Sequence, residues 1–257
     1  MTDVYDFHAG DSPLLVSVPH DGRLLAPGME ETMTEAGLAL PDTDWHVARL
    51  YAFAKDLGAS VIIARYSRYV ADLNRPADDA ALYPGQLATG LCPRQTFDGH
   101  DIYRADVRID TADRVERFWR PYHARIRHTL DRLRRDHGRA LLWDAHSIAS
   151  RVPALFDGEL PVLNIGTFDG RSCDAAMASA VAQAAAQSPY EAVRDARFKG
   201  GYITRHYGDP ANGVHALQLE LAQRAYMDEA TGDYEEARAS QLADTLRAML
   251  AAFTMRA

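Results

Sequence analysis

Two histidines stand where short apolar runs of the sequence end. His20 follows the run Leu14–Val18, and His146 follows the run at residues 140–143. A histidine at the end of a buried strand is held rigidly while its imidazole faces the crevice in which α/β proteins bind ligands. A catalytic zinc takes three protein ligands, usually His with one Asp or Glu, and keeps a fourth position for water. The pair therefore indicates a metallohydrolase, although either histidine alone could be a hydrogen-bonded structural residue.

The third metal ligand is expected to be a carboxylate in the first turn of an early helix, and Asp44 fits best. His46 is the rival, but residues two apart on a helix point about 200° apart, so the two cannot both face one metal. Asp21 is a further alternative. Asp21 and Asp144 lie close in sequence to the two histidines and could instead orient them through hydrogen bonds.

Glu220 is the candidate general base. From Leu217 to Leu221 the leucines alternate with Gln218 and Glu220, so a strand there places the polar side chains on one face. A carboxylate in so apolar a strand is costly unless it is paired or catalytic. Beside an activated water it could take a proton and later pass it to a leaving amine. The alternative is a glutamate on an edge strand that faces solvent.

A segment rich in Gly and Pro, residues 75–104, follows Asn74 and is expected to be a long ordered loop that serves function. Arg75 opens it. Its planar guanidinium could bind a substrate carboxylate, and Asn74 would add a donor. The alternative for Arg75 is a structural ion pair with Asp72 or Asp78.

A second glycine-rich segment, residues 198–213, offers Arg205 and His206 as further substrate contacts, although a histidine in such a loop is usually exposed. The arginines of residues 114–139 alternate with acidic residues, so a solvated helix surface explains them better than a nucleic-acid face. His123, on the same stretch, needs no special role.

Strand-like and helical patterns alternate along the chain, which predicts an α/β fold. Strands are expected at Leu14–Val18, Ser60–Ala64 and residues 140–143, 162–165 and 216–221. Helices are expected at residues 43–57, 111–136, 174–187 and 234–253, with Gly58 and Gly138 after the first two and a kink at Pro121. Without repeats or linkers, residues 1–257 are expected to form a single domain, with a mixed, largely parallel central sheet flanked by helices.

Composition narrows the possible classes of protein. The net charge of −8 argues against general nucleic-acid binding. The only cysteines, Cys92 and Cys173, exclude a disulfide scaffold and fit a reducing cytoplasm. No secretory signal is visible, and no apolar stretch approaches the roughly 18 residues of a spanning helix, so a cytoplasmic protein without a membrane partner is expected. No apolar stripe indicates an oligomeric state.

Six blocks, in order over nearly the whole chain, resemble the N-formylglutamate amidohydrolase (N-formylglutamate deformylase) family, which is zinc-dependent and related in fold to zinc carboxypeptidases and aspartoacylases. The blocks are SVPHDG at residues 17–22, DTDWHV at 42–47, SRYVADLNRP at 67–76, DAHS at 144–147, GYITRHYG at 201–208 and GVHALQLE at 213–220. The ordered set is highly specific, although no single block is.

The resemblance implies a zinc-carboxypeptidase-like (phosphorylase/hydrolase-like) fold and hydrolysis of N-formyl-L-glutamate to formate and glutamate, a step of histidine degradation. Zn²⁺ would be held by His20, Asp44 and His146. The related peptidases bind the substrate carboxylate with an Asn-Arg pair and use a strand glutamate as base; these roles fall on Asn74, Arg75 and Glu220.

Two other functions stay open from sequence. The same metal site could act on another N-acyl amino acid. A non-catalytic protein that binds small carboxylates would keep Arg75, but it would have no use for Glu220 and would lack a metal. In each case the partner is a small molecule with carboxylates.

Overall fold

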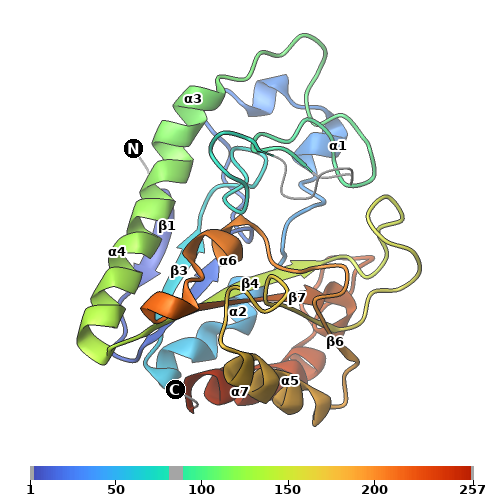
Figure 1. Cartoon of the computed structure of the whole chain (residues 1–257). Helices are drawn as coiled ribbons and strands as arrows, with labels where there is room; N and C mark the ends of the chain where they lie inside the picture. Colours follow the sequence, from blue (N-terminus) through green and yellow to red (C-terminus); the bar gives the residue numbers. More distant parts are fainter. Residues whose placement is uncertain (1–2, 81–88, 256–257) are drawn as a thin grey trace.

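The computed structural model describes residues 3–80 and 89–255 (Figure 1). Its centre is a seven-stranded sheet in the order β1-β3-β2-β4-β7-β5-β6. The strands are β1 (Tyr5–His8), β2 (Leu14–Val18), β3 (Ser60–Ala64), β4 (Ala140–Ile148), β5 (Leu163–Gly166), β6 (Ala192–Arg194) and β7 (Val214–Ala222). β1 is antiparallel to β3 and β5 to β7, while the other neighbours are parallel. The predicted α/β fold with a mixed, largely parallel sheet is confirmed.

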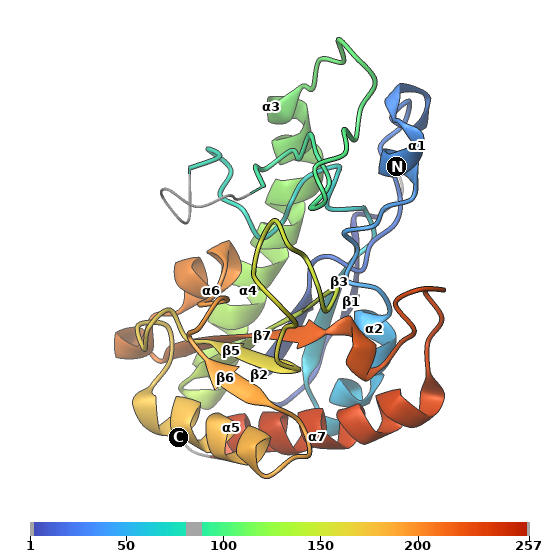
Figure 2. The same ribbon diagram turned by 90° about the vertical axis from the view of Figure 1, so that its right-hand side faces the viewer.

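Helices cover both faces of this sheet, which explains why its central strands are continuous apolar runs. The α-helices are α1 (Glu35–Leu38), α2 (Val47–Leu50), α3 (Thr111–Arg114), α4 (Arg120–His137), α5 (Ala175–Ala186), α6 (Tyr202–Tyr207) and α7 (Glu236–Met255). α2, α5 and α7 pack on one face, and α4 and α6 pack on the other (Figures 1 and 2). None of these helices, within the described ranges, is long and apolar enough to cross a membrane.

Alternation along β4 and β7 decides which side chains can form a site. Leu141, Trp143 and Ala145 point to the face covered by α5 and α7, together with the leucines of β7. Asp144 and His146, which alternate with these residues, therefore point to the face covered by α4 and α6. Polar side chains at the carboxyl end of this second face, among them His146 and Glu220, line a cavity.

The predicted helix at residues 43–57 is wrong in its first turn. The α-helical part is only α2, and a 3₁₀ segment, η2 (Ala52–Leu57), follows it. His46, directly before α2, has a φ of 62° in the left-handed region, so the helix cannot extend back to Asp44. Asp44 lies instead in a turn, where its N–H donates to the carbonyl of His20. The predicted end at Gly58 is confirmed by its φ of 69°.

The predicted helix at residues 111–136 is present as α3, a π-helical turn η3 (Val115–Trp119) and α4. In the π turn the N–H of Arg120 donates to the carbonyl of Val115, directly before Pro121, which has no N–H to offer. This irregular turn lies next to the position where we expect a kink. Gly138, with a φ of 74°, ends α4 as predicted.

Other differences concern short or edge elements. β4 continues to Ile148 because β7 pairs with it along its whole length, so His146 lies inside the strand and not after it. β1 and β6 are edge strands that the apolar pattern misses. α6 and a 3₁₀ turn, η4 (Pro210–Asn212), occupy the predicted loop 198–213, and η1 (Glu30–Thr32) and η5 (Gln223–Ala225) are further single turns. The predicted loop 75–104 has no helix or strand in its described part; residues 81–88 lie outside it.

Candidate metal centre and active-site cavity

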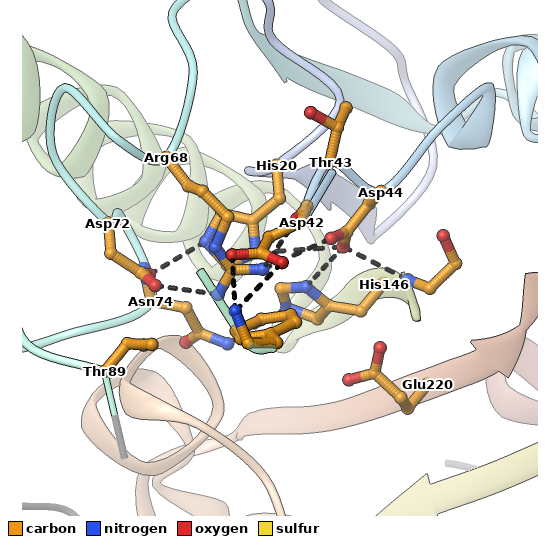
Figure 3. A network of polar contacts seen from close by, with 12 residues as sticks. His20, Asp42, Thr43, Asp44, Arg68, Asp72, Asn74, Thr89, His146 and Glu220 are labelled. Atoms are coloured by element: carbon orange, nitrogen blue, oxygen red, sulfur yellow. Dashed lines mark hydrogen bonds and ion pairs between the residues drawn. The ribbon is translucent and has the colours of Figure 1, made fainter. Parts of the chain in front are cut away.

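The three predicted ligands converge at the carboxyl end of the parallel strands (Figure 3). His20 follows β2, Asp44 lies before α2 and His146 lies in β4. All three are buried, and one potential ligand atom from each lies within 4.8 Å of the others. Asp44 Oδ2 is 3.0 Å from His146 Nδ1 and 3.7 Å from His20 Nδ1. Two imidazole nitrogens and a carboxylate oxygen form a donor set typical of catalytic zinc.

One buried atom of this cluster lacks a partner. Within the described chain, His20 Nδ1 makes no hydrogen bond, while His20 Nε2 lies 2.8 Å from Asp72 Oδ1. Because the ionised Asp72 can only accept, Nε2 carries the proton and Nδ1 keeps its lone pair. Leaving a buried acceptor unpaired costs free energy, which a cation bound beside Asp44 would offset. The residues therefore fit a metal ion.

Asp44 is held ready as an anion. Burial alone would raise the pKa of its carboxyl, but His20 and His146 hold that pKa well below its usual range. The backbone N–H of Ser147 also donates to Asp44 Oδ2 over 3.1 Å, which fixes the carboxylate against β4. An ionised, oriented carboxylate is the form that binds a metal.

Arg68 and Asp72 form an ion-pair network behind the cluster. Arg68 donates to Asp72 Oδ2 over 2.8 Å and to Asp44 Oδ1 over 3.5 Å. Burial would raise the pKa of Asp72, but Arg68, His20 and Arg75 hold it well below its usual range. Asp72 thus orients His20 from the side away from Asp44, as carboxylates commonly do for metal-bound histidines.

Sequence reasoning missed Arg68 and this role of Asp72. The available signal was their four-residue spacing within an otherwise apolar run, since buried charges must be paired. Asp21, considered above as the residue that orients His20, accepts instead from the N–H of Ala48 at the start of α2. His46, the rival ligand, contacts the carbonyl of Gly232 through Nε2 and lies outside the cluster.

His146 is also contacted on its second nitrogen. Nε2 lies 3.0 Å from Asp144 Oδ2, an ion-pair distance without hydrogen-bond geometry, and 3.0 Å from Asn74 Nδ2. Burial would lower the pKa of His146, but Asp144 and Asp44 raise it well above its usual value. Asp144 therefore lies beside His146, but neither of its carboxylate oxygens makes a hydrogen bond within the described chain, and its orienting role stays a prediction.

Glu220 lies directly beside this cluster. The parallel register of β4 and β7 pairs His146 with Glu220, so both side chains point to the same face (Figure 3). Burial raises the pKa of Glu220 to about 8, helped by Asp44 and Asp144 and opposed by His146 and Arg68. The edge-strand alternative is wrong, because β7 lies between β4 and β5.

One cavity brings the cluster, Glu220, Asn74 and Arg75 together. Arg75 donates to the carbonyl and the hydroxyl of Thr89 and to the carbonyl of Asn74. Within residues 3–80 and 89–255 no carboxylate lies within 4.0 Å of its guanidinium, so the proposed structural pair with Asp72 or Asp78 does not form.

The structure does not bring Arg205 and His206 to this cavity. Arg205 lies on α6, where its guanidinium stacks over Phe168. His206 is exposed and stacks on Tyr202. A different arginine, Arg197, lines the cavity from the segment after β6.

His123 is a buried, hydrogen-bonded histidine that contacts the residue before Asn74. Burial lowers the pKa of His123 to about 3, so the ring is neutral. Its Nε2 contacts the carbonyl of Leu73 and its Nδ1 contacts the hydroxyl of Tyr207 on α6, each over 2.9 Å. The first turn of α6 in turn donates to Asn74 Oδ1 through the N–H of Ile203.

Fold and site together define a class: an α/β protein whose sheet presents a His-Asp-His cluster and a buried glutamate to one cavity, as metal-dependent hydrolases do. Residues 12–227 match the N-formylglutamate amidohydrolase family. The chain belongs to this family.

Individual relatives agree with this assignment. The chain is 52% identical over 233 residues to an N-formylglutamate deformylase of Pseudomonas putida, covering 89% of this chain and 87% of that protein. It is 49% identical over 260 residues to an N-formylglutamate deformylase of Pseudomonas aeruginosa, covering 98% and 97%. The crystal structure of an N-formylglutamate amidohydrolase from Ralstonia eutropha superposes with a TM-score of 0.82 at 24% identity, covering 96% of each chain, and thus shows the same fold.

Proposed function

We propose that this protein hydrolyses N-formyl-L-glutamate to formate and L-glutamate, the activity for which its two Pseudomonas relatives are named. The observation that carries the proposal is the meeting of His20, Asp44 and His146 with Glu220 in one cavity. A protein that only bound carboxylates would gain nothing from a buried glutamate beside a metal-binding cluster.

We propose that His20, Asp44 and His146 hold one zinc ion. The unpaired Nδ1 of His20 and the mixed nitrogen and oxygen donors support zinc over the hard cations, which prefer oxygen alone. When bound, zinc would polarise the formyl carbonyl and lower the pKa of water. Proton transfer and substrate binding are carried out by side chains of the protein itself.

Glu220 is proposed as the general base and then the general acid. Its carboxylate takes a proton from the water that attacks the formyl carbon, and it returns this proton to the nitrogen as the C–N bond breaks. The products are formate and the free α-amine of glutamate. A divalent cation beside Asp44 would lower the raised pKa of Glu220, because it stabilises the carboxylate.

Asn74 and Arg75 are proposed to bind the α-carboxylate of the substrate. Arg75 lines the cavity, and no carboxylate of the described residues lies within ion-pair distance of its guanidinium, although its charge helps to lower the pKa of Asp72. Asn74, held by α6 and next to His146, places this contact close to the reacting bond.

We further propose that residues 1–257 act as one metallohydrolase domain, since a single sheet contributes or abuts every site residue. The cytoplasm is the proposed compartment, which suits the two free thiols of Cys92 and Cys173.

The test combines metal analysis of the purified protein with formate release from N-formylglutamate. His146→Ala should lose both metal and activity, and Glu220→Gln should lose activity alone. His46→Ala is the matched control, since that imidazole lies outside the cluster. A higher kcat/KM with another N-acyl amino acid would identify that compound as the substrate in place of N-formylglutamate. A metal-free protein that binds glutamate without turnover would contradict the proposed enzyme.

A further inference from the structure

Among the residues that the structure describes, three arginines line the cavity: Arg68, Arg75 and Arg197. Their partners decide which of them can bind a substrate anion. A guanidinium already paired with buried carboxylates has its charge neutralised and its donors occupied, whereas one bonded only to neutral oxygens keeps its charge for a ligand.

Arg68 is an arginine already paired with buried carboxylates. It is buried, and its two terminal nitrogens donate to Asp72, to Asp44 and to the carbonyl of Asp42. Its positive charge offsets the carboxylate of the cluster residue Asp44 and that of Asp72 behind the cluster. Arg68 therefore stabilises the protein's own anions: its two terminal nitrogens are occupied by them, and only its buried Nε has no partner among the described residues.

Arg197 is an arginine bonded only to a neutral oxygen among the described residues. Its Nε donates to the carbonyl of Leu155 over 2.6 Å, and its guanidinium carbon lies 5.3 Å from the centre of the Phe198 ring. Among the residues that the structure describes, no carboxylate lies within ion-pair distance of it. The fixed Nε leaves the two terminal nitrogens of the fork to an incoming anion.

Arg75 and Arg197 come from different parts of the fold. Arg75 follows Asn74, which contacts the metal-cluster residue His146. Arg197 follows β6, the strand at the far edge of the sheet, and Leu155 and Phe198 line the cavity beside it. The cavity thus offers one cation next to the reacting groups and a second cation among apolar side chains.

We propose that Arg197 binds the distal, side-chain carboxylate of the substrate and so selects N-acyl dicarboxylic amino acids over neutral ones. The inference rests on the proposed function. The α-carboxylate, whose carbon is two bonds from the scissile nitrogen, is bound by Arg75. The two methylenes of a glutamate side chain pack against Leu155 and Phe198, and its γ-carboxylate meets the fork of Arg197.

The experiment compares N-formylglutamate with its neutral isostere N-formylglutamine in the zinc-loaded protein and in Arg197→Gln. Wild-type protein should favour N-formylglutamate in kcat/KM. Arg197→Gln should lose about 10- to 100-fold with N-formylglutamate, the range for charge-assisted hydrogen bonds, and change less than about threefold with N-formylglutamine. The retained activity with the neutral substrate shows that the variant is folded.

Arg171→Gln is the matched control. Like Arg197, Arg171 donates through its Nε to a backbone carbonyl, that of Phe168, and its guanidinium lies over a phenylalanine ring, that of Phe168. Unlike Arg197, it does not line the cavity. It should leave the preference for the dicarboxylate unchanged. An equal loss in both variants, or unchanged selectivity in Arg197→Gln, would overturn the assignment.

Direct binding separates this inference from the proposed function. Should the wild-type protein release no formate, calorimetric binding of the two N-formyl compounds to wild type and Arg197→Gln decides the matter. Tighter binding of N-formylglutamate that depends on Arg197 supports the subsite on its own. Equal binding of both compounds by the wild-type protein would contradict the proposed Arg197 subsite.

Discussion

The substitution Asp72→Asn tests how the metal cluster is held in place. Asp72 is fully buried and makes three contacts of 2.8 Å: to Nε2 of His20, to the N–H of Asn74 and to a terminal nitrogen of Arg68. Asparagine keeps an acceptor for the first two contacts. It places an amide NH₂ against the third, so that two donors face each other.

The size of the effect follows from these contacts. Arg68 keeps the longer contact to Asp44, at 3.5 Å, the carbonyl of Asp42 and its position over the Phe97 ring, so its buried charge loses its main partner. Breaking a buried ion pair costs about 3–5 kcal/mol, less than the total stability of most domains, so the variant should still fold. A neutral acceptor also orients His20 less firmly, which should weaken zinc binding about 10- to 100-fold.

The assay is zinc affinity by competition with a chromophoric chelator, together with urea unfolding of the metal-free protein. Asp21→Asn is the control, because Asp21 adjoins His20 in sequence but bonds to the N–H of Ala48. It should leave zinc affinity within about threefold, since it lies outside the hydrogen bonds that orient the histidines. Unchanged zinc affinity in Asp72→Asn, or an equal loss in Asp21→Asn, would refute the reasoning.

Three further predictions follow from the same contacts. Glu220→Gln should lower kcat for formate release about 10²- to 10⁴-fold while zinc affinity stays within about threefold; a normal rate would exclude Glu220 as the base. Burial raises the pKa of Glu220 to about 8, so the folded metal-free protein holds a proton that the unfolded chain releases near pH 4.5; stability should therefore fall as pH rises from about 4.5 to about 8 and level off above that. Urea unfolding against pH, in chelator, should show this slope in wild type and a flatter one in Glu220→Gln. Tyr207→Phe leaves Nδ1 of His123 unpaired and should lower the free energy of unfolding by about 1–3 kcal/mol and raise KM, with zinc content unchanged; an unaltered KM would show that this network does not position Asn74.

The sequence sufficed for the central strands and for the residues that meet at the end of the sheet. Apolar runs locate β2, β3 and β4 because strands covered by helices on both faces must be apolar throughout. Alternation places Glu220 on the polar face of β7, and the parallel register then puts it beside His146. These are local patterns with direct structural consequences.

What the sequence could not supply depends on contacts between distant segments. The left-handed conformation of His46 shortens the early helix, and nothing in the local pattern marks it. Asp72 meets His20 across 52 residues of chain. Arg197 lines the cavity in place of Arg205 because its segment follows an edge strand of three residues, β6, which carries too weak a signal to be read.

Zinc titration of chelator-stripped protein, followed by formate release from N-formylglutamate, tests the central claim most directly. One zinc ion at His20, Asp44 and His146 predicts negligible activity without metal and a linear rise that ends at about one equivalent. In Asp44→Ala the rise should be absent at the same zinc concentrations. Full formate release by the stripped wild-type protein would contradict the proposed zinc site. So would the same zinc-dependent rise of activity in Asp44→Ala.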